Sequence, residues 1–283
     1  MQLYAINTGK FKLDGGAMFG VVPKKLWSRN YPADENNLST WVLRCLLVVD
    51  EDRKILIDSG VGDKQDEKFF GHFHLHGDDS LERSLNAYGF QLEDITDVVH
   101  THLHFDHCGG SVKWNENRTG FDLTFPNATL WAGRAQFEWA INPNHREKPS
   151  FLKENILPMH ESGRLKLIDE EGELFPNFSV KIFNGHTRGQ IIPHINVNGK
   201  TVVFMGDLLP SAAHIPLPYI MAYDIDPLLT LDEKKQFFAE AIENDYILFF
   251  EHDYYHECCT LKETEKGVRA DKFFTVGDLP GFC

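Results

Sequence analysis

The sequence predicts an α/β fold, because strand-like and helical patterns alternate along the chain without a linker between them. Three apolar segments of strand character are each followed, within a few residues, by a side chain that can bind a metal ion. Polar side chains gathered at strand ends are typical of a layered α/β scaffold. The three segments are residues 178–183 before His186, residues 201–205 before Asp207, and residues 247–250 before His252. We therefore expect residues 1–283 to form one layered domain.

The first predicted elements are two strands joined by a tight turn. Residues 43–49 and 54–57 are apolar runs, and the polar sequence Asp50-Glu51-Asp52-Arg53 separates them, which predicts a β-hairpin. The second run continues into Asp58-Ser59-Gly60-Val61-Gly62. Its two glycines are too few and wrongly spaced for a dinucleotide-binding loop, so this hairpin end predicts no nucleotide site.

Three later segments have helical patterns. Residues 81–88 stop at Gly89, and residues 134–141 stop at Asn142-Pro143, which are residues that commonly end helices. Residues 231–242 form the third predicted helix, because their apolar side chains recur at helical spacing.

The densest functional pattern is His102-Leu103-His104-Phe105-Asp106-His107, which follows the apolar run 95–99. Imidazoles and a carboxylate suit zinc and its first-row neighbours. The alternation of His102 and His104 places both rings on one side of an extended segment. One ion cannot use all four ligands from so short a segment, whereas two adjacent ions can. A dinuclear site needs further ligands, and His186, Asp207 and His252 can supply them.

This pattern resembles the metallo-β-lactamase-fold hydrolases, whose motif is His-x-His-x-Asp-His followed downstream by His, Asp and His. The resemblance implies a four-layer αβ/βα sandwich with two zinc ions per chain, or manganese, iron or cobalt in their place. It further implies a ligand set for each ion and a bridging carboxylate. One ion would be held by His102, His104 and His186, the other by Asp106, His107 and His252, with Asp207 between them.

Other segments resemble one branch of that family, which contains quorum-quenching N-acyl-homoserine lactonases and methyl-parathion-hydrolase-like enzymes. They are residues 14–23, Leu26-Trp27, residues 214–218 and residues 222–224. The resemblance implies that a metal-bridging hydroxide opens the lactone ring of an N-acyl-homoserine lactone. Asp106 would carry a proton to the leaving alkoxide, and Tyr223 or His214 would donate a hydrogen bond to the oxyanion.

The chain departs from the family at one string, which reads Gly185-His186-Thr187-Arg188-Gly189-Gln190 where a final histidine is usual. That histidine is not a metal ligand, so the departure concerns only the residues that support the ligands. Gln190 or His194 is expected to take this supporting role. By the same resemblance, Asp58 is expected to orient a ligand histidine.

Alternative functions share this ligand set. Organophosphate triester hydrolysis would use the same metals. A glyoxalase-II-like thioesterase normally has a basic C-terminal helical region, which the 31 residues after His252 are not expected to form. Asp207 stands where many β-lactam hydrolases have cysteine, which disfavours β-lactam hydrolysis. His104 stands where an iron-based oxygen reductase has glutamate, which excludes that function. A metal-free scaffold of the same fold is the non-enzymatic alternative, and the retention of all seven ligand positions disfavours it.

Composition favours a small-molecule substrate. The chain has 42 acidic and 28 basic residues and a formal charge of −14, which disfavours nucleic acid or an anionic membrane as partner. The cysteine count is odd and there is no CxxC, and residues 1–7 lack the basic region and long apolar stretch of a signal peptide, so we expect reduced thiols in the cytoplasm. The cysteines are Cys45, Cys108, Cys258, Cys259 and Cys283.

Two segments outside the strand pattern carry separate expectations. The apolar N-terminal segment, about residues 11–36, is expected to be a loop that covers the site or packs on a second subunit, burying Met18, Phe19 and Trp27 in a homodimer. The alternating run of His72, His74 and His76 is expected to be a solvent-facing loop that could also line the substrate entrance.

Overall fold

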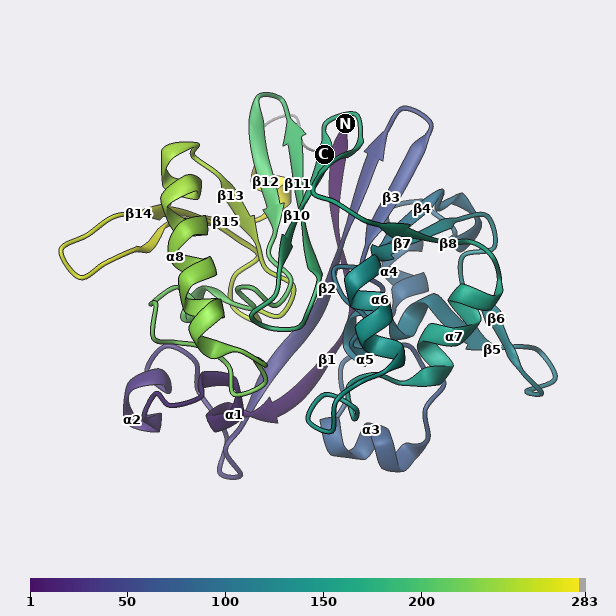
Figure 1. Ribbon diagram of the computed structural model, residues 1–283, viewed down its shortest axis with the longest axis horizontal. Coiled ribbons are helices and arrows are strands. Elements are labelled where there is room, and N and C mark those ends of the chain that lie inside the picture. The colour runs from purple at the N-terminus through teal and green to yellow at the C-terminus, as the bar shows by residue number, and fades with distance from the viewer. Residues whose placement is uncertain (280–283) are drawn as a thin grey trace. The chain divides into compact units, whose positions relative to one another are not determined.

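The computed structural model describes residues 1–279 and divides into two compact units, each assembled from several segments of the chain (Figure 1). The first unit comprises Met1–Lys10, Leu43–Glu171 and Gly189–Ile191, and the second comprises Phe11–Val42, Gly172–Arg188 and the residues from Ile192 onward. The expectation of one domain stays a prediction. The four described cysteines are buried and form no disulfide, whereas Cys283 lies outside the described residues.

The first unit is built on a six-stranded sheet of order β1-β2-β3-β4-β7-β8, although residues 11–14 of β1 and 38–42 of β2 are assigned to the second unit. Its strands are β1 (Gln2–Asp14), β2 (Leu38–Asp50), β3 (Arg53–Ile57), β4 (Asp97–Val99), β7 (Thr129–Gly133) and β8 (Leu165–Ile168). A separate pair consists of β5 (Val112–Trp114) and β6 (Phe121–Leu123). Its helices are α3 (Glu67–Phe73), α4 (Leu81–Ala87), α5 (Phe105–Cys108), α6 (Arg134–Ile141) and α7 (Lys153–Glu161), with 3-10 turns η1 (Leu92–Asp94) and η2 (Gly109–Ser111).

The predicted hairpin is confirmed as β2 and β3, which pair antiparallel from Leu46↔Ile57 to Asp50↔Arg53. Strands β3, β4 and β7 run parallel, so β3 and β4 end at the same edge of the sheet, and Asp58 and the histidine motif follow directly. The predicted helices at 81–88 and 134–141 correspond to α4 and α6. The core between these elements is apolar and includes Leu47, Leu56, Leu85, Val98 and Phe137.

The second unit is built on a seven-stranded sheet of order β15-β14-β13-β12-β11-β10-β9. Its strands are β9 (Gly172–Phe175), β10 (Phe178–Phe183), β11 (Gln190–Val197), β12 (Lys200–Phe204), β13 (Ile247–Phe249), β14 (Cys258–Lys262) and β15 (Arg269–Phe274). Its helices are α1 (Gly15–Phe19), α2 (Lys24–Trp27) and α8 (Pro227–Glu243), with 3-10 turns η3 (Ala212–His214) and η4 (Val276–Asp278). Each unit thus combines a sheet with helices, which confirms the α/β class.

Helix α8 begins four residues before the predicted start at residue 231. The Asp226 side chain accepts a hydrogen bond from Leu229 N (3.0 Å), and Pro227 occupies the first turn, where its missing N–H costs nothing. Its buried face carries Phe237 and Phe238 against an apolar cluster of the same unit. Lys234 lies on that buried face as well.

The N-terminal segment is not the loop that its glycines suggested. Residues 11–14 continue strand β1, and helix α1 follows because the Asp14 side chain accepts from Ala17 N at 2.8 Å. Met18, Phe19 and Trp27 are buried as predicted, but against the same unit, since Phe19 stacks on Trp27 and on His214. A second subunit is therefore not needed to bury them.

The histidine run at 72–76 is also only partly a loop. Helix α3 extends through His72 to Phe73, because Asp66 caps its first turn, and His74 ends it in the left-handed conformation (φ 47°). Within residues 1–279, the close groups of side chains that could hold a metal ion do not include these histidines. Among the same residues, no helix is long and apolar enough to cross a membrane.

Candidate metal centre

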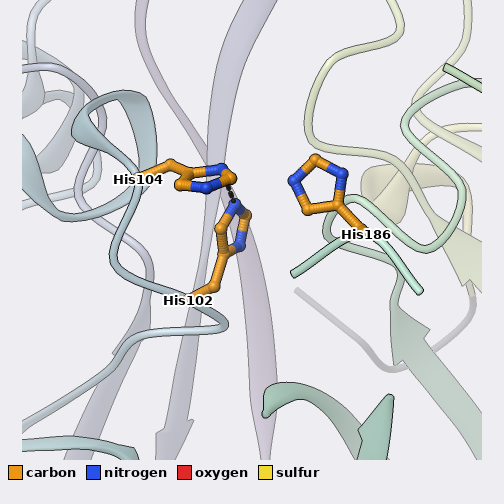
Figure 2. A group of neighbouring side chains, drawn as sticks. All are labelled: His102, His104 and His186. Carbon is orange, nitrogen blue, oxygen red and sulfur yellow. Dashed lines mark hydrogen bonds between the residues drawn. The ribbon is translucent and has the colours of Figure 1, made fainter. Parts of the chain in front are cut away.

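The first ligand set lies where β4 ends in the first unit. His102 and His104 follow the strand in extended backbone, and Asp106 and His107 lie in α5. The Nε2 of His102 and the Nδ1 of His104 are 3.0 Å apart (Figure 2). The three histidines are buried, whereas the Asp106 side chain retains 14% of its exposure. The rings of His102 and His104 thus lie on one side of the segment, as their alternation in the sequence predicts.

Asp58 supports this set from the end of β3. One of its oxygens, Oδ2, lies 3.0 Å from His107 Nδ1, and its carboxylate also accepts hydrogen bonds from Thr101 N (2.8 Å) and Thr101 Oγ1 (2.6 Å). The side chain is fully buried and its backbone is left-handed (φ 59°), a strained conformation for aspartate that is commonly found at functional sites. Asp58 therefore has the geometry expected of a residue that orients His107.

Gly109 and Gly110 allow the ligand segment to pack closely on the residues after Asp58. A Cβ at Gly109 would lie 2.1 Å from Val61 O, and one at Gly110 would lie 2.1 Å from Ser59 O. Cys108, just before them, is fully buried, and burial raises its pKa to about 12. It therefore remains a thiol and packs as the small side chain that the sequence suggested.

The second ligand set lies at three strand ends of the second unit. His186 follows β10, Asp207 follows β12 and His252 follows β13. The two oxygens of Asp207 face different rings: Oδ2 is 3.2 Å from His186 Nε2, and Oδ1 is 3.3 Å from His252 Nε2. A carboxylate that presents one oxygen toward each of two imidazoles fits a ligand shared between two ions.

The second nitrogen of each ring in this unit contacts a protein oxygen. His186 Nδ1 lies 2.9 Å from Asp224 Oδ1, and His252 Nδ1 lies 2.8 Å from Val42 O. Histidines that bind metals usually donate their other N–H to a carboxylate or a backbone carbonyl, which fixes the tautomer and directs the free nitrogen at the ion. Both histidines meet that requirement.

In the first unit, His102 makes such a hydrogen bond, whereas His104 faces a carboxylate beyond hydrogen-bond distance. His102 Nδ1 lies 3.0 Å from Thr101 Oγ1, and His104 Nε2 lies 3.7 Å from Glu147 Oε1. Glu147 is buried and also accepts hydrogen bonds from Trp139 Nε1 and Asn144 Nδ2. Imidazoles and carboxylates arranged in this way fit a divalent metal site.

Sequence reasoning missed the roles of Thr101, Glu147 and Asp224. Thr101 adjoins the motif, and Asp224 stands in the segment 222–224 that already resembled the family, so both carried a signal. Glu147 lies in an irregular segment between α6 and α7, and its place in the sequence gave no indication of its role.

Of the two predicted oxyanion donors, His214 is fully engaged inside the second unit. Its Nε2 lies 2.8 Å from Met18 O and its Nδ1 lies 2.7 Å from Ser211 Oγ, while its ring stacks on Phe19. Burial lowers its pKa to about 3, so the ring is neutral. His214 therefore anchors helix α1, and this geometry does not favour the donor role. Tyr223 is 40% exposed beside Asp224, and its donor role stays a prediction.

The two predicted supporting residues differ in their surroundings. Gln190 is fully buried in the first unit, where its neighbour Ile191 donates to Thr101 O at 2.8 Å. His194 lies in the second unit, bonds Ile192 O and meets Tyr246 edge-on. The supporting role of either residue stays a prediction.

Comparisons with known proteins identify several relatives of this chain. A family model described as the metallo-beta-lactamase superfamily matches residues 42–119. A solved structure described as a probable metal-dependent hydrolase from Staphylococcus aureus is 30% identical, with a TM-score of 0.88, and the match covers 97% of this chain and 96% of that one.

Two further relatives are named as lactonases. The N-acyl homoserine lactonase AiiA of Bacillus thuringiensis subsp. kurstaki is 26% identical over 266 residues, which cover 89% of this chain and 93% of the relative. The structure of AidC, described as a dizinc quorum-quenching lactonase in complex with a product, has a TM-score of 0.79 at 21% identity and covers 96% of this chain and 95% of that one. The latter likeness shows the fold.

Proposed function

The chain belongs to the metallo-beta-lactamase superfamily as a metal-dependent hydrolase, and on that premise we propose that it opens the lactone ring of N-acyl homoserine lactones. The observation that carries the proposal is the carboxylate of Asp207, which faces His186 with one oxygen and His252 with the other. This arrangement supports a site for two ions rather than one. The relatives named as N-acyl homoserine lactonases support the substrate class.

We assign the ligands as the family motif does. His102, His104 and His186 would hold one ion, Asp106, His107 and His252 the other, and Asp207 would bridge. Two divalent ions bound in this way would lower the pKa of a shared water from about 16 towards 7 and polarise the scissile carbonyl. We propose zinc as the metal.

Two side chains of the chain itself are proposed to act on the reacting atoms. Asp106 keeps partial exposure and lies 3.9 Å from His107 Nε2. At this position it would accept the proton that the shared water loses and pass it to the departing alkoxide. Tyr223 is exposed and adjoins Asp224, and its hydroxyl would donate to the oxyanion.

An aromatic cluster of the first unit supports a substrate with an apolar tail. Phe105 lies between two proposed ligands, and its ring meets Phe69 at 5.2 Å and Phe73 at 4.7 Å between centroids. Both partners belong to α3, a helix with no fully buried residue, so the cluster is half open. Burial of acyl methylene groups against these rings would contribute about 0.8 kcal/mol each.

A substrate panel tests the proposal. The metal-loaded protein is given homoserine lactones of increasing acyl length, simple aliphatic lactones, aryl phosphotriesters and glutathione thioesters, and ring opening is followed by proton release and product mass. We expect the highest kcat/KM for the acyl homoserine lactones, and loss of that activity in chelator-treated protein. A higher kcat/KM for a phosphotriester or thioester would overturn the assignment.

A further inference from the structure

Lys234 occupies a position in α8 where an apolar side chain would be expected. It lies on the same helix face as Phe237, Phe238 and Ala241 and is 1% exposed. Its ammonium donates to His214 O (2.7 Å), Tyr219 O (2.9 Å) and Pro216 O (3.4 Å). An ammonium has three N–H donors, so these three carbonyls satisfy it.

The three carbonyls belong to the irregular segment between β12 and α8, here called the 211–226 loop. This loop also carries Asp224, which contacts His186 Nδ1. It is fixed further on by Ala222 N, which donates to Ala17 O at 2.7 Å, and by Ile225 N, which donates to His186 O at 3.1 Å. The loop therefore links α8, helix α1 and the turn that carries His186.

Glu233, the residue before Lys234, binds the backbone of the turn that carries His186. Its Oε1 accepts from Asn184 N (2.7 Å) and its Oε2 accepts from Gly185 N (3.0 Å). Gly185 also packs on the helix, since a Cβ there would lie 2.3 Å from Thr230 Oγ1. Two adjacent residues of α8 therefore bind neighbouring segments: Glu233 binds the turn that carries His186, and Lys234 binds the loop that carries Asp224.

The charge of Lys234 interacts with the carboxylate of Asp224 beyond salt-bridge distance, and burial lowers the pKa of the amine to about 7. Among the described residues, its ammonium meets only backbone carbonyls within hydrogen-bond distance, and it makes no ion pair. A methionine would fill similar volume without the cost of desolvating a charge. The feature that the ammonium adds is the convergence of three carbonyls that would otherwise repel one another.

We propose that Glu233 and Lys234 are positioning residues. From helix α8 they hold the backbone around His186 and Asp224 so that the Asp224 carboxylate stays in contact with His186 Nδ1. They touch no reacting atom. Glu233 fixes the backbone of His186, and Lys234 fixes the loop whose Asp224 sets the ring tautomer. This inference rests on the metal site of the proposed function, in which His186 is a ligand.

The test measures zinc affinity by chelator competition and amide hydrogen exchange in the metal-free protein. Lys234→Met should lower zinc affinity about tenfold and Asp224→Asn about 10- to 100-fold, the range found when a residue supporting a metal ligand is lost. Adding Lys234→Met to Asp224→Asn should cause no further loss, because both act through the same contact. In metal-free Lys234→Met, the amides of Ala222 and Ile225 should exchange faster. Glu233→Gln should instead speed exchange at Asn184 and Gly185.

Lys181→Met and Glu240→Gln provide matched controls, because this pair lies in the same unit and involves the same helix. Both controls should retain zinc affinity and loop exchange. Additive losses in the double variant, or equal losses in the controls, would overturn the proposal. So would general unfolding of both Lys234→Met and Lys234→Gln, because the role would then belong to the core as a whole. Neither readout uses a substrate, so a failure to hydrolyse lactones would refute the proposed function and leave this inference standing.

Discussion

At the scale of single residues, the proposed ligand histidines share one feature, which is an oxygen atom close to the second nitrogen of each ring. Every proposed ligand histidine presents one nitrogen to an oxygen of its own unit, and those oxygens come from Asp58, Thr101, Val42 and Asp224, with Glu147 further off. For His102, His107, His186 and His252 these hydrogen bonds favour the tautomer whose other nitrogen can bind an ion. Two predictions follow for individual carboxylates.

Asp58→Asn should weaken metal binding although it changes no proposed ligand. The amide keeps the shape of the carboxylate but cannot supply the charge that polarises His107. We expect zinc affinity to fall about 10- to 100-fold. Asp63→Asn, five residues away at an exposed position, is the control and should bind as wild type. Equal zinc affinities for the two variants would contradict a supporting role for Asp58.

Asp106→Asn should separate a proton carrier from a plain ligand. Asparagine retains an oxygen but cannot accept a proton, so turnover should fall about a hundredfold or more, as is usual for lost general acid–base catalysis. The loss should be smaller for a thiolactone or an aryl phosphotriester, whose leaving groups need less protonation. As a control, His72→Ala should change neither turnover nor metal content, because His72 lies outside the candidate metal site. Equal losses for good and poor leaving groups, with metals intact, would leave Asp106 only a ligand.

At the scale of elements, much of the fold and the placement of the candidate ligands at strand ends could be predicted, because apolar periodicity and strand-end polar residues are local signals. The hairpin of β2 and β3, helix α6 and the strand ends before His186 and His252 all follow from such signals. Glu147 could not be found in this way, because its role depends on a tertiary contact between irregular segments. Helix α1 was missed because glycines usually indicate loops, whereas Asp14 supplies a cap.

The contact between α1 and His214 predicts a pH dependence of stability. Burial lowers the pKa of His214 from 6.5 to about 3, so the folded protein keeps the ring neutral while the unfolded chain takes up a proton below about pH 6.5. The contribution is present above pH 6.5 and is lost as the pH falls towards 3. Between pH 7 and pH 5 it amounts to about 2 kcal/mol.

The measurement is the free energy of unfolding of metal-free protein at pH 7 and at pH 5, by denaturant titration. His214→Gln cannot titrate, so its stability should fall by about 2 kcal/mol less than that of wild type over this interval. An identical pH dependence in the two proteins would show that His214 is not held neutral in the fold.

At the scale of the whole molecule, we predict a homodimer. Met18, Phe19 and Trp27 cannot form the interface, because they are buried in their own unit. The same segment still presents Val21 at 93% exposure and Leu26 at 45%. Light scattering after size exclusion should give twice the chain mass, and Val21→Asp with Leu26→Asp should shift it towards one chain. A wild-type monomer would contradict the prediction.

The central claim is that the two ligand sets hold two ions bridged by Asp207, and metal content measures it most directly. The wild-type protein, purified without chelator and loaded with zinc, should contain about two equivalents per chain. Asp207→Ala should lower occupancy at both positions, because one carboxylate faces both His186 and His252. An Asp207→Ala protein that retains two equivalents of zinc and full activity would contradict the account.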